Sequence, residues 1–418
     1  MFNGLQTQLY YKQIYMNIVS IFSGRKTNIE ILKKYLKKAL ELNIIHEVHF
    51  WNNARNPDDE EYLKSISNLK RTSSTLGGNY ILITPVLTNN SFDINVKARN
   101  DIHIKLTNLS TEYEIVLGGW NNTKSVIREN NNEIYSLLQN VADENSYINI
   151  KILVKDDTLN ILKNNELIIS QKIKGDFEIK DIYFKTGHNC IGDLTYNTSK
   201  NKGFYFMDTC EKNWKNYYSY YTNYENDIII KCDDDIVFID LYKLPKFLDF
   251  IKNNDYDLVF ANTINNGVSA YFQQNKYNLI PKDLMNLEYP DGGLCGSLWE
   301  SGKKAEKLHD YFIKNYGDFL DYNYDNEIIP INTRYSINFF AYKGNKWFKI
   351  KDAYEDDEAI LTIKYVKENN FKNILYSDFY VSHLSFYRQV ETGIDLNKLT
   401  NSYDKLYNTM EETGRFNI

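Results

Sequence analysis

The sequence has few cysteines, no excess of basic residues and no long hydrophobic run. Its four cysteines, at positions 190, 210, 232 and 295, show neither metal-ligand spacing nor the density of a disulfide framework, which indicates a reducing compartment. A formal net charge of -6 argues against a general binder of nucleic acid or anionic membranes, because such binders rely on dense positive patches.

No stretch of the chain approaches the roughly 18 apolar residues of a membrane helix. The N-terminus lacks the charged, then apolar, then small-residue pattern of a signal peptide. We therefore expect a soluble, cytoplasmic protein that has neither nucleic acid nor a membrane as a partner. At 418 residues, of which 43% are hydrophobic, the chain exceeds one usual core and predicts more than one domain.

The first 75 residues alternate between strand and helix patterns. The runs MNIVSIF and IIHEVHFWNN predict strands, and an amphipathic helical pattern follows each of them. Thr27, with Glu30 three residues later, predicts a capping box at the start of the first helix. This βαβ rhythm implies a parallel sheet.

Between residues 76 and 198 the hydrophobic period changes to two. SFDINVKAR places Phe92, Ile94, Val96 and Ala98 on one face of a strand. Further short strands follow with turn signals and no helix between them, which is typical of a β-sandwich or jelly roll. We predict an all-β domain over residues 76–198, inserted into one α/β domain formed by residues 1–75 and 199–418.

The stretch IIIKCDDDIVFID, residues 228–240, places three carboxylates among apolar residues. The order predicted there is a buried strand, an acidic loop and a helix with Pro245 in its first turn. Ligands of open α/β sheets bind at the carboxyl ends of strands, where this order places Asp233, Asp234 and Asp235. Because adjacent carboxylates repel, the cluster indicates either a solvated acidic turn or a cation site.

Four features in this order resemble the nucleotide-sugar glycosyltransferases of the GT-A fold, whose Rossmann-like mixed sheet is flanked by helices. They are a DxD motif at residues 233–235, a glycine-rich acceptor loop in YPDGGLCGS, an x-Glu-Asp motif at residues 354–356 and a late histidine, His383. The resemblance implies sugar transfer from a nucleotide-sugar donor, with a UDP-sugar expected, to a glycan or glycoprotein acceptor. The chain looks most like enzymes of giant DNA viruses of amoebae, which implies the host cytoplasm as its location.

The resemblance also implies roles for the motif residues. Asp235 and His383 would hold Mn²⁺ or Mg²⁺, with Mn²⁺ slightly favoured by the histidine. Asp233 would face the ribose or the donor sugar, and it is also a candidate metal ligand. The acceptor loop would consist of Gly292, Gly293 and Gly296.

Candidates for the donor nucleotide follow the first two predicted strands or belong to the acidic motif. They are Ser23, Gly24, Arg25, Asn52 and Asp234. Arg334 is a further candidate for the diphosphate, without a motif to support it.

A catalytic base is expected in the acidic segment that follows residue 354. An acceptor hydroxyl is a weak nucleophile, so an inverting enzyme needs a carboxylate base. Glu355, Asp356 and Asp357 are the candidates, with Asp356 at the literal motif position, and because Glu358 adjoins them the sequence does not choose between these carboxylates. The competing explanation is that these carboxylates stabilise the first turn of a helix through its dipole.

Two runs in the predicted all-β segment, FDINVKARNDIHIKL and YEIVLGGWNNTKSVIR, resemble the farnesoic acid O-methyltransferase-type domain over most of residues 80–195. The segment lacks the glycine-rich loop and the helices that bind S-adenosylmethionine, so we expect a binding or spacer module. Trp120 is a candidate for stacking on a sugar ring, and the alternative is a core tryptophan beside a glycine turn. A second functional hypothesis is therefore a non-catalytic carbohydrate-binding protein whose sandwich recognises a glycan.

Overall fold

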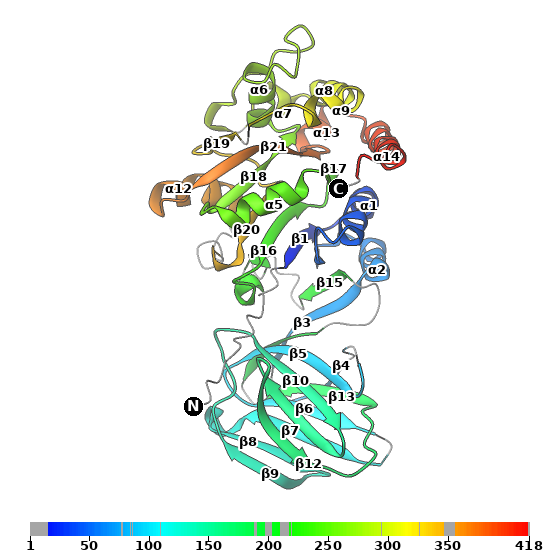
Figure 1. Cartoon of the computed structure of the whole chain (residues 1–418), viewed down its shortest axis with the longest axis vertical. Helices are drawn as coiled ribbons and strands as arrows, with labels where there is room; N and C mark the ends of the chain where they lie inside the picture. Colours follow the sequence, from blue (N-terminus) through cyan, green and yellow to red (C-terminus); the bar gives the residue numbers. More distant parts are fainter. Residues whose placement is uncertain are drawn as a thin grey trace, which may run out of the picture.

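The structure is a computed structural model that describes residues 16–416, except 77, 84, 86, 109, 188–189, 197–202, 210–216, 219, 294, 326 and 347–355. The chain forms a mixed α/β part and an all-β part, drawn one above the other in Figure 1. Within the described ranges, no helix has both the length and the apolar character needed to cross a membrane.

The sheet of the α/β part is mixed. Its strands lie in the order β15 (Phe204–Thr209), β2 (Glu47–Asn52), β1 (Asn17–Ser23), β16 (Ile228–Asp233), β20 (Phe339–Lys343), β18 (Leu258–Ile264), β21 (Asn373–His383) and β17 (Ile236–Ile239), with β19 (Ile328–Pro330) paired to β21. β1 pairs in parallel with β2 and β16, whereas β20 is antiparallel to β16 and β18. Every residue of β18 and β21 is buried, as expected for strands covered on both faces.

Helices pack against this sheet and against each other. They are α1 (Lys26–Glu41), α2 (Pro57–Ile66), α5 (Leu244–Asn253), α6 (Gly267–Asn275), α7 (Ser297–Glu300), α8 (Gly302–Lys314), α9 (Tyr316–Leu320), α11 (Asp357–Ala359), α12 (Tyr365–Glu368), α13 (Tyr387–Glu391) and α14 (Leu396–Glu412). A π-helical segment, Ile360–Lys364, joins α11 to α12. Pro245 lies in the first turn of α5, as predicted. The predicted capping box at Thr27 is wrong, because α1 begins at Lys26 with Arg25 as its N-cap.

Two antiparallel sheets with one apolar core between them form the all-β part, which we call the sandwich. One sheet has the order β3 (Asn68–Leu76), β14 (Ile191–Thr195), β5 (Ser91–Ala98), β10 (Ile148–Lys155), β11 (Thr158–Lys163), β12 (Glu166–Lys172). The other has the order β4 (Ile81–Ile83), β13 (Asp181–Thr186), β6 (Ile102–Thr107), β7 (Glu112–Gly118), β8 (Lys124–Glu129), β9 (Asn132–Leu138). Alternate residues of β5, β6 and β10 are buried, which fits the period of two in the sequence.

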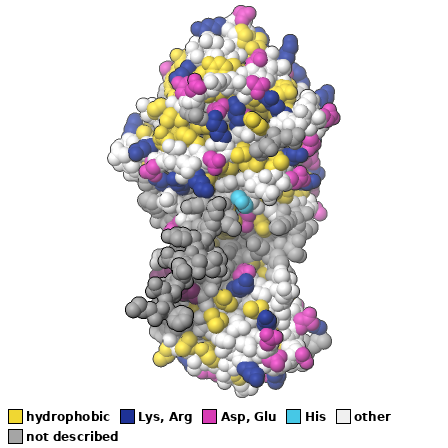
Figure 2. All heavy atoms as spheres, viewed as in Figure 1, with side chains coloured by type: hydrophobic (Ala, Val, Ile, Leu, Met, Phe, Trp, Pro, Cys, Tyr) yellow, Lys and Arg dark blue, Asp and Glu magenta, His cyan; other side chains and the backbone are white. Residues whose placement is uncertain are grey.

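One strand connects the two parts. β3 pairs in parallel with β15 and antiparallel with β14, so the α/β sheet continues into one sheet of the sandwich. The apolar cores nevertheless remain separate, because one contains residues from 83 to 196 and the other contains residues before 67 and after 203. On the face drawn in Figure 2, hydrophobic side chains gather mainly over the α/β part, among scattered Lys and Arg side chains.

Candidate functional site

The carboxyl ends of β1 and β16 form the centre of the candidate site. The sheet extends from β1 to β2 and, after the sandwich, to β15 on one side, and the chain then adds β16 on the other side of β1. The strand order reverses at this point, and open α/β sheets bind ligands at such reversals. The loops after the two strands touch here, since the backbone N–H of Gly24 donates to Oδ2 of Asp234 at 2.9 Å.

The acidic turn joins two strands, whereas the sequence predicted a strand and a helix on its two sides. β16 ends at Asp233, and β17 then pairs with the end of β21 so that Ile236 lies opposite His383. The N–H of Leu384 also donates to the carbonyl of Asp235 at 2.9 Å. The pairing of β17 with β21 therefore places His383 beside the acidic turn.

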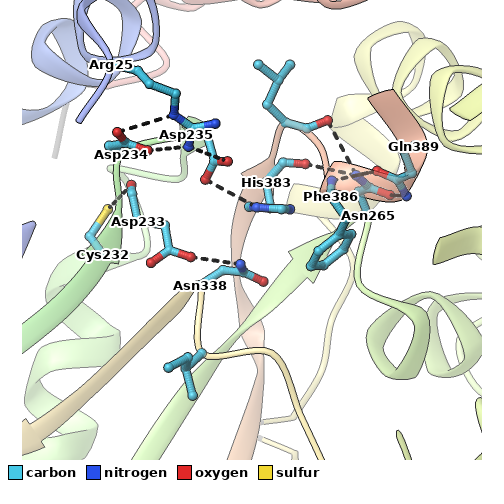
Figure 3. Close-up of polar contacts among 12 residues, drawn as sticks. Arg25, Cys232, Asp233, Asp234, Asp235, Asn265, Asn338, His383, Phe386 and Gln389 are labelled. Carbon is cyan, nitrogen blue, oxygen red and sulfur yellow. Dashed lines mark hydrogen bonds and ion pairs between the residues drawn. The ribbon is translucent and has the colours of Figure 1, made fainter. Parts of the chain in front are cut away.

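Asp233, Asp235 and His383 converge on one point (Figure 3). One potential ligand atom of each lies within 4.8 Å of the others. Nε2 of His383 is 3.2 Å from Oδ1 of Asp235, which is the distance of an ion pair without the geometry of a hydrogen bond. Oδ1 of Asp235 and Nδ1 of His383 are buried and make no hydrogen bond within the described part of the chain. Two carboxylates and an imidazole are a ligand set that fits a divalent cation such as Mn²⁺.

The acidic turn is buried, so its interpretation as a solvated turn is wrong. Asp234 and Asp235 are 6% and 5% exposed. Burial opposes the charge of Asp235, but His383 and Arg25 outweigh it and hold the pKa of this carboxyl below its usual range. Burial raises the pKa of Asp234, although Arg25 acts in the opposite direction.

Arg25 bridges the two carboxylates of the turn. Its guanidinium pairs with Asp234 and lies 2.9 Å from Oδ2 of Asp235. The side chain of Arg25 is about one-third exposed, so this cation can be reached from solvent. A planar guanidinium is suited to phosphate as well as to carboxylate, which gives the site a group that can change partners.

Asp233 has separate partners. The buried ammonium of Lys231 pairs with Oδ1 of Asp233, and Nδ2 of Asn338 donates to Oδ2 at 2.9 Å. Burial lowers the pKa of Lys231, but Asp233 and Asp357 outweigh it and leave that pKa above its ordinary value. Lys231 is therefore a buried, positively charged side chain beside Asp233.

An amide pair fixes the backbone around His383. Asn265 and Gln389 exchange hydrogen bonds of 2.9 and 2.8 Å, and Nδ2 of Asn265 also donates to the carbonyl of His383 at 3.3 Å (Figure 3). These hydrogen bonds hold the backbone of His383 at the end of β21.

A cavity of about 360 Å³ opens beside Asp233. Its aromatic wall consists of Phe22, Tyr217 and Tyr218, and its charged wall consists of Lys231, Asp233 and Asp357. Ring faces next to fixed charges suit a ligand that combines an apolar face with polar groups, such as a sugar or a nucleoside.

The carboxylates of Asp356, Asp357 and Glu358 have different partners. Asp356 caps α11 by accepting from the N–H of Ala359, and Asp356 and Glu358 both pair with Arg334, at 3.1 and 2.5 Å. Asp357 instead lines the cavity and accepts from the hydroxyl of Tyr218 at 2.9 Å. Burial raises the pKa of Asp357, whereas Lys231 lowers it. Glu355 lies outside the described residues.

The predicted glycine loop does not line the cavity. Gly292, Gly293 and Gly296 all have positive φ, and a Cβ at Gly293 would lie 1.9 Å from the carbonyl oxygen of Arg334. Glycine at 293 is therefore needed for close packing against the segment that carries Arg334. Arg334 itself is paired with Asp356 and Glu358.

The remaining donor candidates have local partners. The hydroxyl of Ser23 donates to the carbonyl of Ile21, and Oδ1 of Asn52 accepts from the N–H of Ala54. Nδ2 of Asn52 is buried and has no hydrogen-bond partner in the described ranges. Neither residue lines the cavity beside Asp233.

The sequence analysis missed Lys231, Tyr217 and Tyr218. Lys231 had a signal, because it is a charged residue inside an apolar strand, two positions before the acidic turn. The tyrosines had none, since 35 tyrosines are spread over the chain.

Comparison with known proteins supports the identity of the sandwich. Residues 74–182 match the family model described as farnesoic acid 0-methyl transferase, which confirms the resemblance found in this segment. No curated protein matches the chain.

Several solved structures are similar to about a third of the chain. The carbohydrate-binding module CBM66 of Bacillus subtilis is 9% identical, with a TM-score of 0.23 over 30% of this chain and 96% of that chain. Galectin LEC-6 of Caenorhabditis elegans is also 9% identical, with a TM-score of 0.23 over 30% of this chain and 95% of that chain. A Bacillus subtilis protein of unknown function with a galectin-like fold is 6% identical, with a TM-score of 0.24 over 34% and 90%. These TM-scores carry no conclusion about function, and the family assignment extends to residues 74–182 alone.

Proposed function

We propose that this protein is a metal-dependent glycosyltransferase of the GT-A type, which moves a sugar from a nucleotide-sugar donor to a glycan or protein acceptor. The observation that carries the proposal is the convergence of Asp233, Asp235 and His383 beside a cavity that also contains Asp357. The position of this group at the reversal of strand order supports it.

The metal site would stabilise the diphosphate leaving group. Asp233, Asp235 and His383 would hold Mn²⁺ or Mg²⁺, and a bound ion supplies Lewis-acid stabilisation to a diphosphate. Arg25 can pair with the same diphosphate by exchanging a carboxylate partner for a phosphate oxygen. We take a UDP-sugar as the first donor to test.

Asp357 is the base that we favour, in place of Asp356. In the transfer, a bond forms between the acceptor oxygen and the anomeric carbon while the bond from that carbon to the diphosphate breaks. The proton of the acceptor hydroxyl passes to Asp357, and the nucleoside diphosphate leaves. A carboxyl whose pKa is raised by burial is suited to this role, and attack opposite the leaving group inverts the anomeric centre.

The test is donor hydrolysis and transfer by purified protein, using a panel of UDP-, GDP- and dTDP-sugars with Mn²⁺. We expect nucleotide release from one donor, its loss on chelation with EDTA, and its loss in an Asp235→Ala variant. Asp357→Asn should lower kcat by at least about 100-fold with little change in donor affinity, because it removes the base and keeps the shape.

Asp356→Asn is the matched control, since it changes a neighbouring carboxylate that caps α11 and asparagine also caps helices well. Equal losses in the two variants would reject Asp357 as the base. Nucleotide binding without release from any donor would reject the enzyme and favour the alternative, a non-catalytic carbohydrate-binding protein.

A further inference from the structure

A second cavity lies in the sandwich, far along the sequence from the acidic turn. Its volume is about 740 Å³. Three connections line it: the turn from β5 to β6 at residues 99–100, the turn after β7 at residues 121–122, and the loop before β10 at residues 140–145. The cavity is therefore formed mainly by these loops, with Lys163 at the end of β11 completing the lining.

Side-chain amides dominate the lining of this cavity, which includes Asn100, Asn121, Asn122, Asn140 and Asn145. Each amide offers both a donor and an acceptor, the combination that pairs with a hydroxyl group.

The charges in the same lining balance. Arg99 and Lys163 are opposed by Asp143 and Glu144, so the lining has no net formal charge. Oδ1 of Asp143 already accepts from the N–H groups of Asn145 and Ser146, at 2.8 and 3.1 Å, which occupies one of its two carboxylate oxygens. An amide-rich lining whose described charges cancel favours a neutral, hydroxyl-rich ligand over an anion.

Hydrogen bonds within the protein fix the walls of the cavity in the absence of a ligand. Oδ1 of Asn122 accepts from the N–H groups of Val141 and Ala142 at 3.0 and 2.9 Å, and its Nδ2 donates to the carbonyl of Ala142 at 2.8 Å. A Cβ at Gly118 would lie 2.4 Å from Oδ1 of Asn122, so this turn requires glycine there. A site with fixed walls loses little conformational entropy on binding.

Asn100 provides the independent sign of a ligand. Asn100 is 6% exposed and lines the cavity, and its Oδ1 has no hydrogen-bond partner among the residues that the structure describes. A buried acceptor without a partner is costly, and a ligand hydroxyl that donates to it removes that cost.

We propose that this cavity binds a neutral carbohydrate, whose hydroxyl groups pair with Asn100 and Asn121. The site is separate from the one around Asp233 and does not depend on the activity proposed there. It would let the sandwich hold a glycan while the α/β part acts on one.

The test uses the full chain against an immobilised panel of neutral and anionic oligosaccharides, followed by calorimetric titration with a neutral oligosaccharide retained by the protein. Asn121→Gly removes an exposed amide and keeps the left-handed turn, since Asn121 has φ 58. Asn100→Ala removes the buried acceptor. We expect each variant to bind the neutral oligosaccharide about tenfold more weakly.

Asn131→Gly is the matched control, because Asn131 is an exposed asparagine with φ 70 in the turn between β8 and β9, and it does not line the cavity. It should bind as the unmodified protein does, and so should Asp235→Ala. Melting temperatures show whether each variant is folded, and Asn121→Gly decides the matter if Asn100→Ala unfolds. Failure to bind any neutral oligosaccharide, binding of anionic ones alone, or unchanged affinity in Asn121→Gly would overturn the proposal.

Discussion

The two parts of the molecule place their polar side chains differently. Buried charged residues in the α/β part include Lys231, Asp234, Asp235, Asp240 and Asp378. Among the described residues of the sandwich, every buried polar side chain is uncharged; these are Ser91, Asn100, Ser125, Thr186 and Thr195. Burying a charge is costly unless it is paired, so the α/β part carries a cost that the sandwich avoids. The difference indicates that the sandwich is held mainly by apolar packing, whereas the α/β part keeps charged side chains in its interior.

The largest expected effect tests whether the two cores are independent. Ile115 is fully buried in the sandwich, and Ile115→Ala should lower the free energy of unfolding of that part by about 2–5 kcal/mol through lost contacts and a cavity. Hydrogen exchange resolved by peptide should show faster exchange in β5, β7 and β10 and little change in β16 or β21.

Ile230→Ala, at an equally buried position of β16, is the matched change in the other core. It should give the reverse pattern. Because β3 pairs with strands of both parts, exchange that accelerates equally throughout would instead mean that the continuous sheet makes one cooperative unit.

Two carboxyls, Asp240 in the α/β part and Glu114 in the sandwich, should contribute to the pH dependence of stability with opposite signs. Burial raises the pKa of Asp240 to about 7, while an unfolded aspartate titrates near ~3.9. The folded state therefore holds this proton more tightly, and the stability it gives is present in acid and lost as pH rises through about 7. Asp240→Asn should remove that loss, and at pH 8 the variant should be more stable by up to about 4 kcal/mol.

Glu114 in the sandwich represents the opposite case. Hydrogen bonding from His103 lowers its pKa despite burial, and Arg128 also binds it, at 2.6 Å. Its contribution is present above the unfolded value of ~4.3 and is lost as pH falls. Urea unfolding of Glu114→Gln should show a loss of about 1–2 kcal/mol near neutral pH that shrinks in acid. Parallel pH profiles for the Asp240 and Glu114 variants would contradict this comparison.

The sequence predicted the sandwich better than the α/β site. Alternation in stretches such as SFDINVKAR reports which face of a strand is buried, and β5 is buried as that pattern requires. The parallel start of the α/β sheet was equally readable, because β1, α1 and β2 are local patterns. The position of Trp120 could not be predicted in this way. Trp120 is 50% exposed, so its interpretation as a core residue is wrong.

The arrangement of the candidate site depends on long-range pairing that local patterns do not contain. Asp235 and His383 meet because β17 pairs with the end of β21, and β17 itself was not predicted. The choice of Asp356 or Asp357 as the candidate base depends on their side-chain partners. Asp356 pairs with Arg334, and Asp357 accepts from Tyr218. Neither partner can be inferred from the spacing of residues in the acidic segment.

Backbone strain is the feature in which the two parts are most alike. Outside glycine, nearly all residues with positive φ are asparagine or aspartate, which tolerate the left-handed region. The exceptions among described residues are Trp120 in the sandwich, with φ 51, and Cys295 in the α/β part, with φ 68. Trp120 has a compensating contact, because the ammonium of Lys124 lies 4.9 Å from the centre of its ring.

The smallest expected effect separates these two strained positions. Cys295→Asn should raise the free energy of unfolding by about 0.5–1 kcal/mol, because asparagine reaches the same conformation at lower cost. Trp120→Asn relieves similar strain but loses a cation–π contact worth about 0.5–1 kcal/mol at an exposed site, so its stability should hardly change. Urea denaturation of both variants measures the difference, with Asn130→Gly as a control at an unstrained left-handed position. A clear gain in Trp120→Asn would mean that the Lys124 contact contributes nothing, and that the sandwich keeps a strained tryptophan for a reason other than its own stability.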